Sequence, residues 1–303
     1  MIYILGAGAI GFPLAGYLAK AGKPVVAVRT SRSDVPRGAV TVTVQHGADR
    51  VKQSVDTISL AKLDTLDGMV VVTSKAYANR AIARALKEKD VSAPIVIMQN
   101  GVGVEKPFLE ASFSSVYRCV LYVTSQSASE CEFTFSPVAA SPIGLVKGHA
   151  SELAGCVEQL STDAFPFRPD ADIEREVWKK AIINAVFNSI CPLLEVDNGI
   201  FARDAATARI GREIVAECVT LTDRLGVELT EEAIMEQLMQ ISDRSEGQLI
   251  STLQDIRSGR QTEIEFLNIE MARIAASLNP ELHLPKTELL GKMIEAKSQQ
   301  QRK

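Results

Sequence analysis

The sequence has few of the residues from which metal sites and histidine-based catalytic triads are built. It contains three histidines, His46, His149 and His283, in 303 residues. The five cysteines are an odd number, lie far apart and form no C-x-x-C pair, so neither a zinc site nor a disulfide framework is expected. We therefore expect no metal, and cysteine usage of this kind favours a reducing, cytoplasmic location.

The sequence also has no excess of positive charge. The 33 lysines and arginines are outnumbered by 37 aspartates and glutamates, which leaves a net charge of −4. Nucleic-acid surfaces need a basic patch or stripe, so we expect no nucleic-acid partner. A small anionic substrate is not excluded, because one local lysine or arginine is enough to bind it.

The first 19 residues carry no charged side chain, which is long enough to suggest a membrane span or a signal peptide. However, no basic residue precedes the apolar run, and four glycines and Pro13 interrupt it. We therefore expect a buried strand, a turn and a helix here, and no membrane association.

The order of predicted elements divides the chain into two domains, as its length suggests. In residues 1–169, apolar strands alternate with helices, which predicts a mainly parallel sheet. Strands are expected at 2–5, 24–28, 40–45, 69–73, 95–98, 116–124, 131–135, 142–146 and 165–168, and helices at 11–20, 76–88 and 150–162. Residues 170–303 show only helical patterns, at 172–190, 204–225, 231–242, 247–257, 262–278 and 286–298. The expected fold is an α/β domain followed by an all-α domain.

A G-x-G-x-x-G turn directly follows the first strand and opens the first helix. Its residues are Gly6, Ala7, Gly8, Ala9, Ile10 and Gly11. Glycines allow a tight turn and a close approach of backbone to phosphate, and the helix N-terminus favours negative charge. In this context the motif predicts a Rossmann-type domain that binds the pyrophosphate of a dinucleotide. The alternative is a plain tight turn.

The end of the second strand bears on which dinucleotide binds. An acid at this place would bind the ribose 2′-hydroxyl of NAD, but the sequence has Arg29, Thr30, Ser31 and Arg32. Guanidinium groups suit a 2′-phosphate, so NADP(H) is favoured, with Arg29 the stronger candidate because it follows the strand directly. The alternative is that both arginines are solvated loop charges.

Lys75 and Asn100 follow two further strands. Ligands of open α/β sheets bind beyond the carboxyl ends of the strands, so we expect both residues on the same rim as the glycine turn. Taken singly, each is equally well explained as a loop charge or an Asn-Gly turn.

In the helical half, Lys180, Asn184 and Asn188 are spaced four residues apart and form one polar stripe on an otherwise apolar helix. The stripe faces either binding partners or solvent, and the pattern does not decide. Glu263 near a helix start is equally explained by the helix dipole. Asn198-Gly199 alone indicates only a turn.

Taken together, these residues resemble the ketopantoate reductase (2-dehydropantoate 2-reductase) family over essentially the whole chain. The resemblance rests on the glycine turn, Lys75, Gln99-Asn100-Gly101, the series Lys180, Asn184, Asn188 and Asn198, and residues 253–255 and 259–264. It implies a Rossmann domain that binds NADPH, and a helical domain, like that of 6-phosphogluconate dehydrogenase, that closes the cleft.

The resemblance also implies roles. Hydride is transferred to C2 of a 2-keto acid, and Lys180 would be the general acid, with Glu263 beside it at the active site. Substrate would be held by Asn184, Asn188, Asn198 and Ser251, while Lys75 and Asn100 would lie beside the cofactor. A small 2-keto acid is the expected partner, and a homodimer is left open.

Two departures from the family pattern concern the choice of keto acid. The segment 117–124 is bulkier than the family's strand, and Thr287 replaces an Asn or His after Pro285. Two alternatives are therefore kept: a related NADPH-dependent reductase of another 2-keto acid, and an NADP(H)-binding sensor without turnover.

Overall fold

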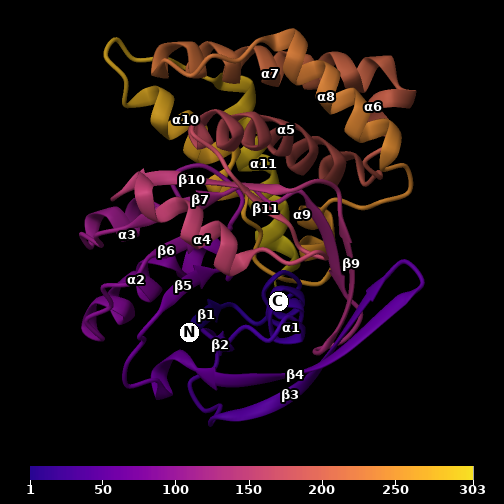
Figure 1. Cartoon of the computed structure of the whole chain (residues 1–303). Coiled ribbons are helices and arrows are strands. Elements are labelled where there is room, and N and C mark those ends of the chain that lie inside the picture. The colour runs from indigo at the N-terminus through magenta and orange to yellow at the C-terminus, as the bar shows by residue number, and fades with distance from the viewer. Residues whose placement is uncertain (303) are drawn as a thin grey trace. The chain divides into compact units, whose positions relative to one another are not determined.

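A computed structural model describes residues 1–302 and divides them into two compact units (Figure 1). The α/β unit comprises Met1–Gln99 and Val104–Ile173, and the helical unit comprises Asn100–Gly103 and the chain from Glu174 onward. The α/β domain followed by an all-α domain that the sequence predicts is confirmed. The short segment Asn100–Gly103 groups with the helical unit although it lies between strands of the α/β unit.

One large sheet organises the α/β unit. Its order is β11-β10-β7-β6-β5-β1-β2-β4-β3-β9-β8. The strands are β1 (Ile2–Leu5), β2 (Val25–Arg29), β3 (Gly38–His46), β4 (Asp49–Ser59), β5 (Met69–Val72), β6 (Ile95–Ile97), β7 (Val116–Cys119), β8 (Val123–Ser127), β9 (Glu132–Pro137), β10 (Ser141–Lys147) and β11 (Phe167–Pro169).

The centre of the sheet is parallel. β1 lies between β2 and β5, with Ile2 opposite both Val25 and Met69, and β6 and β7 continue the parallel run. Nearly every side chain of β1, β5 and β6 is buried, as in sheets covered on both faces. This arrangement places the carboxyl ends of β2, β1, β5 and β6 side by side.

The flanks of the sheet correct the sequence prediction. The pairs β3/β4, β7/β10 and β8/β9 are antiparallel, so the sheet is mixed. β4 was not predicted, because Asp49–Ser59 is largely polar and its first half is exposed or half-buried. The single strand predicted at 116–124 is two strands, β7 and β8, which lie near opposite ends of the sheet order.

Helices complete the α/β unit. They are η1 (Leu60–Lys62), η2 (Ala76–Ala78), η3 (Ala150–Glu152), α1 (Gly11–Lys20), α2 (Asn79–Glu88), α3 (Lys106–Glu110) and α4 (Leu153–Leu160). The core joins buried residues of α1, such as Phe12 and Leu18, to sheet residues such as Ile4 and Val71. The three helices predicted here are confirmed, while α3 was not foreseen.

The helical unit is built around a long helix, α5 (Ile173–Leu194). The others are α6 (Ile200–Arg203), α7 (Ala205–Leu225), α8 (Glu231–Arg244), α9 (Ser251–Arg257), η4 (Ile264–Phe266), α10 (Asn268–Ala276) and α11 (Pro285–Gln301). The core surrounds α5 with residues such as Ile182, Val186 and Met271.

Two helical predictions were wrong in detail. The helix predicted from 247 begins only at Ser251, because Gly247 adopts the left-handed φ of +76°. The helix predicted over 262–278 is divided, because Leu267 has a non-helical backbone with φ −115° and ψ −106°. In the resulting turn, the carbonyl of Phe266 accepts a hydrogen bond from the Val102 amide at 2.9 Å.

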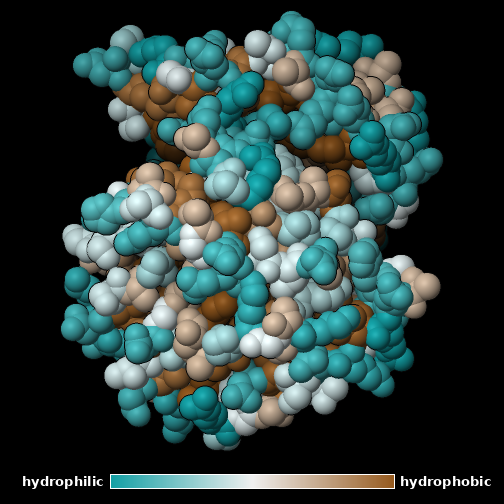
Figure 2. All heavy atoms as spheres, viewed as in Figure 1, coloured by the Kyte–Doolittle hydropathy of each residue, from teal (hydrophilic) through white to brown (hydrophobic). Residues whose placement is uncertain are grey.

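Within residues 1–302, no helix is long and apolar enough to cross a membrane. In the view of Figure 2, hydrophilic side chains cover most of the visible surface, and hydrophobic ones show between them in patches.

Candidate functional site

Each glycine of the G-x-G-x-x-G turn meets a different steric demand. Gly6 has a φ of +124°, and a Cβ there would lie 2.3 Å from the Ser74 amide nitrogen. A Cβ on Gly11 would lie 1.8 Å from the Gly6 carbonyl oxygen. Gly8 is exposed, and nothing lies within 4 Å of where its Cβ would be. The first and third glycines therefore pack the turn, and the second leaves its backbone open to a ligand.

The N-terminus of α1 lies beside this opening, and within its first turn the amides of Phe12 and Leu14 donate to the Gly8 and Ile10 carbonyls. No side chain caps the helix at Ile10, and its first turn holds no acidic residue. Ala7, Ala9 and Ile10 are partly exposed around the open Gly8. A helix N-terminus of this kind binds phosphate through its free N–H groups and its dipole. The cradle that a Cβ on Gly8 would fill thus fits the pyrophosphate of a dinucleotide.

Hydrogen bonds join the neighbouring strand ends into one rim. The Thr73 hydroxyl donates to the Gly6 carbonyl at 2.8 Å, and the Gly6 amide donates to the Val28 carbonyl at 2.9 Å. The side-chain amide of Gln99 donates to the Ser74 carbonyl at 2.6 Å. The ends of β2, β1, β5 and β6 are therefore physically connected, as the sequence led us to expect.

Arg29, the last residue of β2, is held in place on two sides. Its guanidinium lies 5.3 Å from the centroid of the Phe12 ring, at cation–π distance. It also forms an ion pair of 2.9 Å with Glu130, and its side chain is only 14% exposed. Arg32 lies 3.8 Å from the same carboxylate oxygen and is more exposed. Arg29 is thus a fixed, half-buried cation at the rim rather than a solvated loop charge.

Lys75 lies just after β5, on the same side of the sheet. It precedes η2 in an extended conformation and is half-buried. Next to it, the hydroxyl oxygen of Ser74 is buried without a hydrogen-bond partner.

The Asn100–Gly103 turn is fixed against the segment that follows Glu263. A Cβ on Gly101 would lie 2.4 Å from the Phe266 carbonyl oxygen, and Gly101 has a φ of +99°. With the bond from the Val102 amide to Phe266, this contact explains why the turn groups with the helical unit. Asn100 is exposed, so its amide is open to a ligand.

Two of the predicted substrate residues are brought together by α5 and α9. Asn188, at 4% exposure, accepts hydrogen bonds through its Oδ1 from Thr252 at 2.7 Å and Ser251 at 3.4 Å. Its Nδ2 donates to the Asn184 carbonyl at 2.9 Å. The amide of Asn188 therefore joins the polar stripe of α5 to the start of α9. Thr252 was not among the predicted residues, and only its position next to Ser251 could have suggested it.

Asn198 lies in the loop before α6, whose backbone is held at several points. Its amide donates to the Gln248 carbonyl at 2.9 Å, and its carbonyl accepts from the Ser242 hydroxyl at 2.7 Å. Its side-chain Oδ1 is buried with no hydrogen-bond partner. Buried polar atoms are rarely left unsatisfied in native proteins, so this oxygen is a candidate ligand contact.

The remaining predicted residues, Lys180, Asn184 and Glu263, are all half-buried in the helical unit. Lys180 and Asn184 are flanked on α5 by buried apolar residues such as Ala181 and Ile183. Glu263 directly precedes η4, and its carbonyl accepts from the Phe266 amide at 3.0 Å. The convergence of Lys180 with Glu263 stays a prediction.

The first part of the bulky segment after the Gln-Asn-Gly turn, residues 117–121, is buried inside the α/β unit. Arg118 is 3% exposed, forms an ion pair with Glu105, and donates to the Gln99 carbonyl at 3.3 Å. The Gln99 side chain forms a second contact, a paired amide hydrogen bond with Asn79. This departure therefore acts on the backbone that leads into Asn100. The sequence indicated the bulk of the segment but not this contact.

The second departure, Thr287, is also internal. It is fully buried, and its hydroxyl and amide both donate to the carboxylate of Glu217, at 2.8 and 2.9 Å. Glu217 thus satisfies amides at the start of α11, where negative charge is favoured. Thr287 serves this helix junction in the helical unit.

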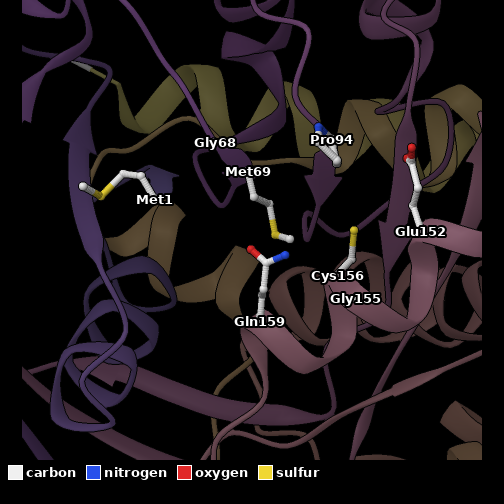
Figure 3. A pocket seen from close by; sticks show the side chains of 8 residues that line it. All are labelled: Met1, Gly68, Met69, Pro94, Glu152, Gly155, Cys156 and Gln159. Atoms are coloured by element: carbon white, nitrogen blue, oxygen red, sulfur yellow. The ribbon is translucent and has the colours of Figure 1, made fainter.

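A separate cavity of about 310 Å³ lies at the amino ends of the central strands, away from the rim described above (Figure 3). Its lining includes Met1, Met69 and Pro94, which precede or begin β1, β5 and β6. The side chains of Met69, Cys156 and Gln159 converge in it, and burial raises the pKa of the Cys156 thiol to about 11. The thiol is therefore protonated at neutral pH, and the cavity contains none of the predicted site residues. Within the described chain, no group of three or more His, Cys, Asp or Glu could hold a metal ion.

Comparison with known proteins gives matches over nearly the whole chain. The family model for ketopantoate reductase PanE/ApbA matches residues 2–144, and the model for the C-terminal part of the same family matches residues 172–298. A curated relative, the 2-dehydropantoate 2-reductase of Pyrococcus horikoshii, is 27% identical and covers 98% of this chain and 97% of its own length.

Solved structures share the fold. A D-mandelate dehydrogenase with NADH and anilino(oxo)acetate aligns with a TM-score of 0.86 at 17% identity, over 100% of both chains. A dimeric ketopantoate reductase from Staphylococcus aureus aligns with a TM-score of 0.83 at 18% identity, over 99% of both chains.

Proposed function

Because this chain belongs to the ketopantoate reductase PanE/ApbA family, we propose that it reduces 2-dehydropantoate (ketopantoate) to pantoate with NADPH, a step of pantothenate and coenzyme A biosynthesis. The observation that carries the proposal is the pair of family matches at 2–144 and 172–298. The open cradle at Gly8 and the fixed cation Arg29 support the choice of cofactor.

The cofactor is assigned to the rim of the α/β unit. The backbone from Gly6 to Gly11 would bind the pyrophosphate, and the guanidinium of Arg29 would bind the 2′-phosphate. Lys75 and Asn100 would bind the ribose and nicotinamide end, since both follow strands whose ends form this rim. When bound, NADPH supplies the hydride that converts the C2 carbonyl of the keto acid to an alcohol.

Lys180 is proposed as the general acid. Reduction of the C2 carbonyl places negative charge on its oxygen, and the ammonium of Lys180 stabilises that charge and then donates a proton to it. The reaction then balances as keto acid, NADPH and a proton giving hydroxy acid and NADP⁺. Glu263 is proposed to orient the ammonium. The apolar neighbours of Lys180 on α5 support this role, because an ammonium attracts a negatively charged oxygen more strongly where water is limited.

The substrate is assigned to the amides and hydroxyl of the helical unit. Asn198 offers an unsatisfied buried oxygen, which would accept a hydrogen bond from the hydroxyl of the substrate. Asn188 holds Ser251 next to the α5 stripe, so the Ser251 hydroxyl and the Asn184 amide would bind the carboxylate or the alcohol end. These groups act by hydrogen bonding and geometry, and none needs a metal.

We further propose a cytoplasmic enzyme that forms a homodimer. The curated relatives are named for a small-molecule reduction, and a related ketopantoate reductase is described as dimeric. Size-exclusion chromatography with light scattering tests the oligomeric state, and a monomer at micromolar concentration would overturn the dimer.

A second candidate is reduction of another 2-keto acid. It is favoured by the similarity in fold to a D-mandelate dehydrogenase. It is also favoured by Arg118, which belongs to the segment that departs from the family pattern and donates to the Gln99 carbonyl, next to Asn100. A sensor that binds NADP(H) without turnover is the third.

One assay separates the three candidates. Purified protein is mixed with NADPH and either ketopantoate or a panel of 2-keto acids, including benzoylformate, and the loss of absorbance at the nicotinamide band is followed. The highest kcat/KM is expected with ketopantoate. A higher value with another keto acid would replace the first candidate by the second. NADPH binding without turnover of any keto acid would favour the sensor.

The proposed acid is tested by Lys180→Ala, with Lys179→Ala as the matched control. Lys179 is the adjacent lysine and forms an ion pair of 3.5 Å with Glu176. Lys180→Ala should lose about 10²–10⁴-fold in kcat, the usual contribution of a general acid, and still bind NADPH. Lys179→Ala should retain near-normal turnover. Normal turnover in Lys180→Ala would remove this residue from the mechanism.

A further inference from the structure

Glu130 is an acidic residue at the cofactor rim that the sequence did not single out. It lies at the tip of the β8–β9 hairpin, where the amides of Ala128 and Ser129 both donate to the Glu132 carbonyl, at 2.8 and 3.2 Å. Its side chain is 63% exposed, so its carboxylate is accessible to a ligand as well as to the protein.

The hairpin that carries Glu130 is firmly attached to the glycine turn. The Ser125 hydroxyl of β8 donates to the Ala9 carbonyl within the G-x-G-x-x-G turn. On β9, the ring of Phe133 lies 5.9 Å from that of Phe12, the aromatic ring beneath Arg29. Glu130 is therefore held at the rim by contacts on both strands of its hairpin.

The carboxylate of Glu130 contacts both arginines that follow β2. Its Oε1 lies 2.9 Å from a terminal nitrogen of Arg29 and 3.8 Å from one of Arg32. Arg29 is the more buried of the two, since its side chain is 14% exposed and that of Arg32 is 53% exposed. An internal anion therefore already binds the guanidinium groups proposed to bind the 2′-phosphate.

We propose that Glu130 is a specificity-determining residue that lowers the preference of this protein for NADPH over NADH. The inference rests on the proposed function, in which Arg29 binds the 2′-phosphate. A phosphate monoester carries about −1.5 to −2 charges near pH 7, so it competes with this carboxylate for the guanidinium of Arg29 and is repelled by it. In NAD-binding Rossmann folds an acidic side chain accepts a hydrogen bond from the ribose 2′-hydroxyl, and Glu130 would do the same for NADH from the hairpin.

The fold itself does not decide between the two cofactors. A D-mandelate dehydrogenase of the same fold holds NADH. The preference for one cofactor is therefore set by individual side chains at the end of β2 and on the β8–β9 hairpin. In this chain they have opposite effects, because Arg29 favours the phosphate and Glu130 favours the hydroxyl.

The test measures the Kd of the full-length protein for NADPH and for NADH by fluorescence titration, for the wild type and for Glu130→Gln. Glutamine keeps the size of the side chain and removes its charge. The matched control is Glu132→Gln on the same hairpin, because Glu132 pairs with Arg50 at 3.0 Å and not with Arg29.

Glu130→Gln should bind NADPH more tightly by about three- to tenfold, because an exposed ion pair and a close charge repulsion each change affinity severalfold. Its affinity for NADH should stay the same or fall. Glu132→Gln should leave both affinities unchanged. Raising the salt concentration should shrink the difference between Glu130→Gln and wild type, since exposed charges are screened.

An unchanged ratio of the two Kd values in Glu130→Gln would overturn the proposal, and so would weaker NADPH binding, which would make Glu130 a support for the arginines. Arg29→Ala distinguishes this failure from failure of the proposed cofactor site. If Arg29→Ala weakens the binding of NADPH far more than that of NADH, only the proposed role of Glu130 is refuted. If Arg29→Ala weakens the binding of both cofactors equally, the assignment of the 2′-phosphate to Arg29 is refuted as well.

Discussion

Alanine at Gly8 should impair cofactor binding without impairing folding. Nothing lies within 4 Å of the Cβ that the substitution would add, and the backbone of Gly8 is outside the left-handed region. An alanine that fits its site raises stability by about 0.4–1 kcal/mol, because it restricts the unfolded chain. The free energy of unfolding of Gly8→Ala should therefore equal or slightly exceed that of the wild type.

The cost should appear in the affinity for NADPH. The added methyl occupies the space through which phosphate approaches the backbone, so at least one charge-assisted hydrogen bond is lost. Such a bond is worth about 1.5–3 kcal/mol. This loss corresponds to a roughly 10- to 150-fold increase in the Kd for NADPH.

Gly11→Ala is the contrasting variant. Its Cβ would lie 1.8 Å from the Gly6 carbonyl oxygen and 2.7 Å from the Thr73 hydroxyl oxygen, so α1 must move away from the sheet. Overpacking of this kind destabilises by about 1–3 kcal/mol or more. The control for a harmless alanine is Gly155→Ala on α4, an exposed glycine whose Cβ would also meet nothing within 4 Å.

The assay combines chemical unfolding of each variant with fluorescence titration by NADPH. Gly8→Ala should be as stable as the wild type or slightly more stable, and it should bind weakly. Gly11→Ala should unfold more easily. Gly155→Ala should also be at least as stable as the wild type and should bind NADPH normally. Wild-type affinity in Gly8→Ala would refute the binding of pyrophosphate at this turn. Destabilisation of Gly8→Ala equal to that of Gly11→Ala would refute the steric reasoning.

Two further variants and the reactivity of one thiol test other parts of the molecule. Gly101→Ala should lose about 1–3 kcal/mol of stability and raise the KM for the keto acid, because its φ of +99° and the Phe266 carbonyl at 2.4 Å leave no room for a Cβ; wild-type stability would contradict the contact. The hydrogen bonds from Arg203 hold the pKa of Asp197 below its usual value, so the stability that the pair adds is present above about pH 4 and is lost as the pH falls through the lowered pKa. Asp197→Asn should therefore be less stable than the wild type at pH 7, by at most about 1 kcal/mol, and the difference should shrink as the pH falls below about 4; a loss independent of pH would exclude the ion pair as its cause. Cys156, whose thiol pKa is raised to about 11 by burial, should escape alkylation at pH 8 in the folded protein, and rapid labelling detected by mass spectrometry would contradict its burial.

Local patterns in the sequence predicted the elements that carry the cofactor. The apolar strand Ile2–Leu5, the spaced glycines and the helix after them form a signal within 20 residues, and the structure confirms each element. The rim could be predicted as well, because the carboxyl ends of parallel strands must lie along one edge of a sheet. Arg29 was identified by this rule together with its charge, because an arginine stands where an acid would bind the ribose of NAD.

Strands whose sequence carries no apolar periodicity escaped prediction. β4 is mostly polar and its first half is exposed or half-buried, and it forms because it pairs with β2 and β3. The division of 116–124 into β7 and β8 was equally hidden, because a continuous extended pattern does not reveal that the chain leaves one part of the sheet for another. In both cases partner strands decide the structure, and propensity does not.

The sequence by itself therefore determined the two-part fold, the phosphate-binding turn and the list of polar residues available to the site. Only the tertiary structure decided which of them meet: Asn188 with Ser251 and Thr252, and Arg29 with Glu130. These partners are separated by more than 60 residues, and in one case by 101. Contacts at such separations are set by the packing of helices and the register of strands, which local sequence patterns do not encode.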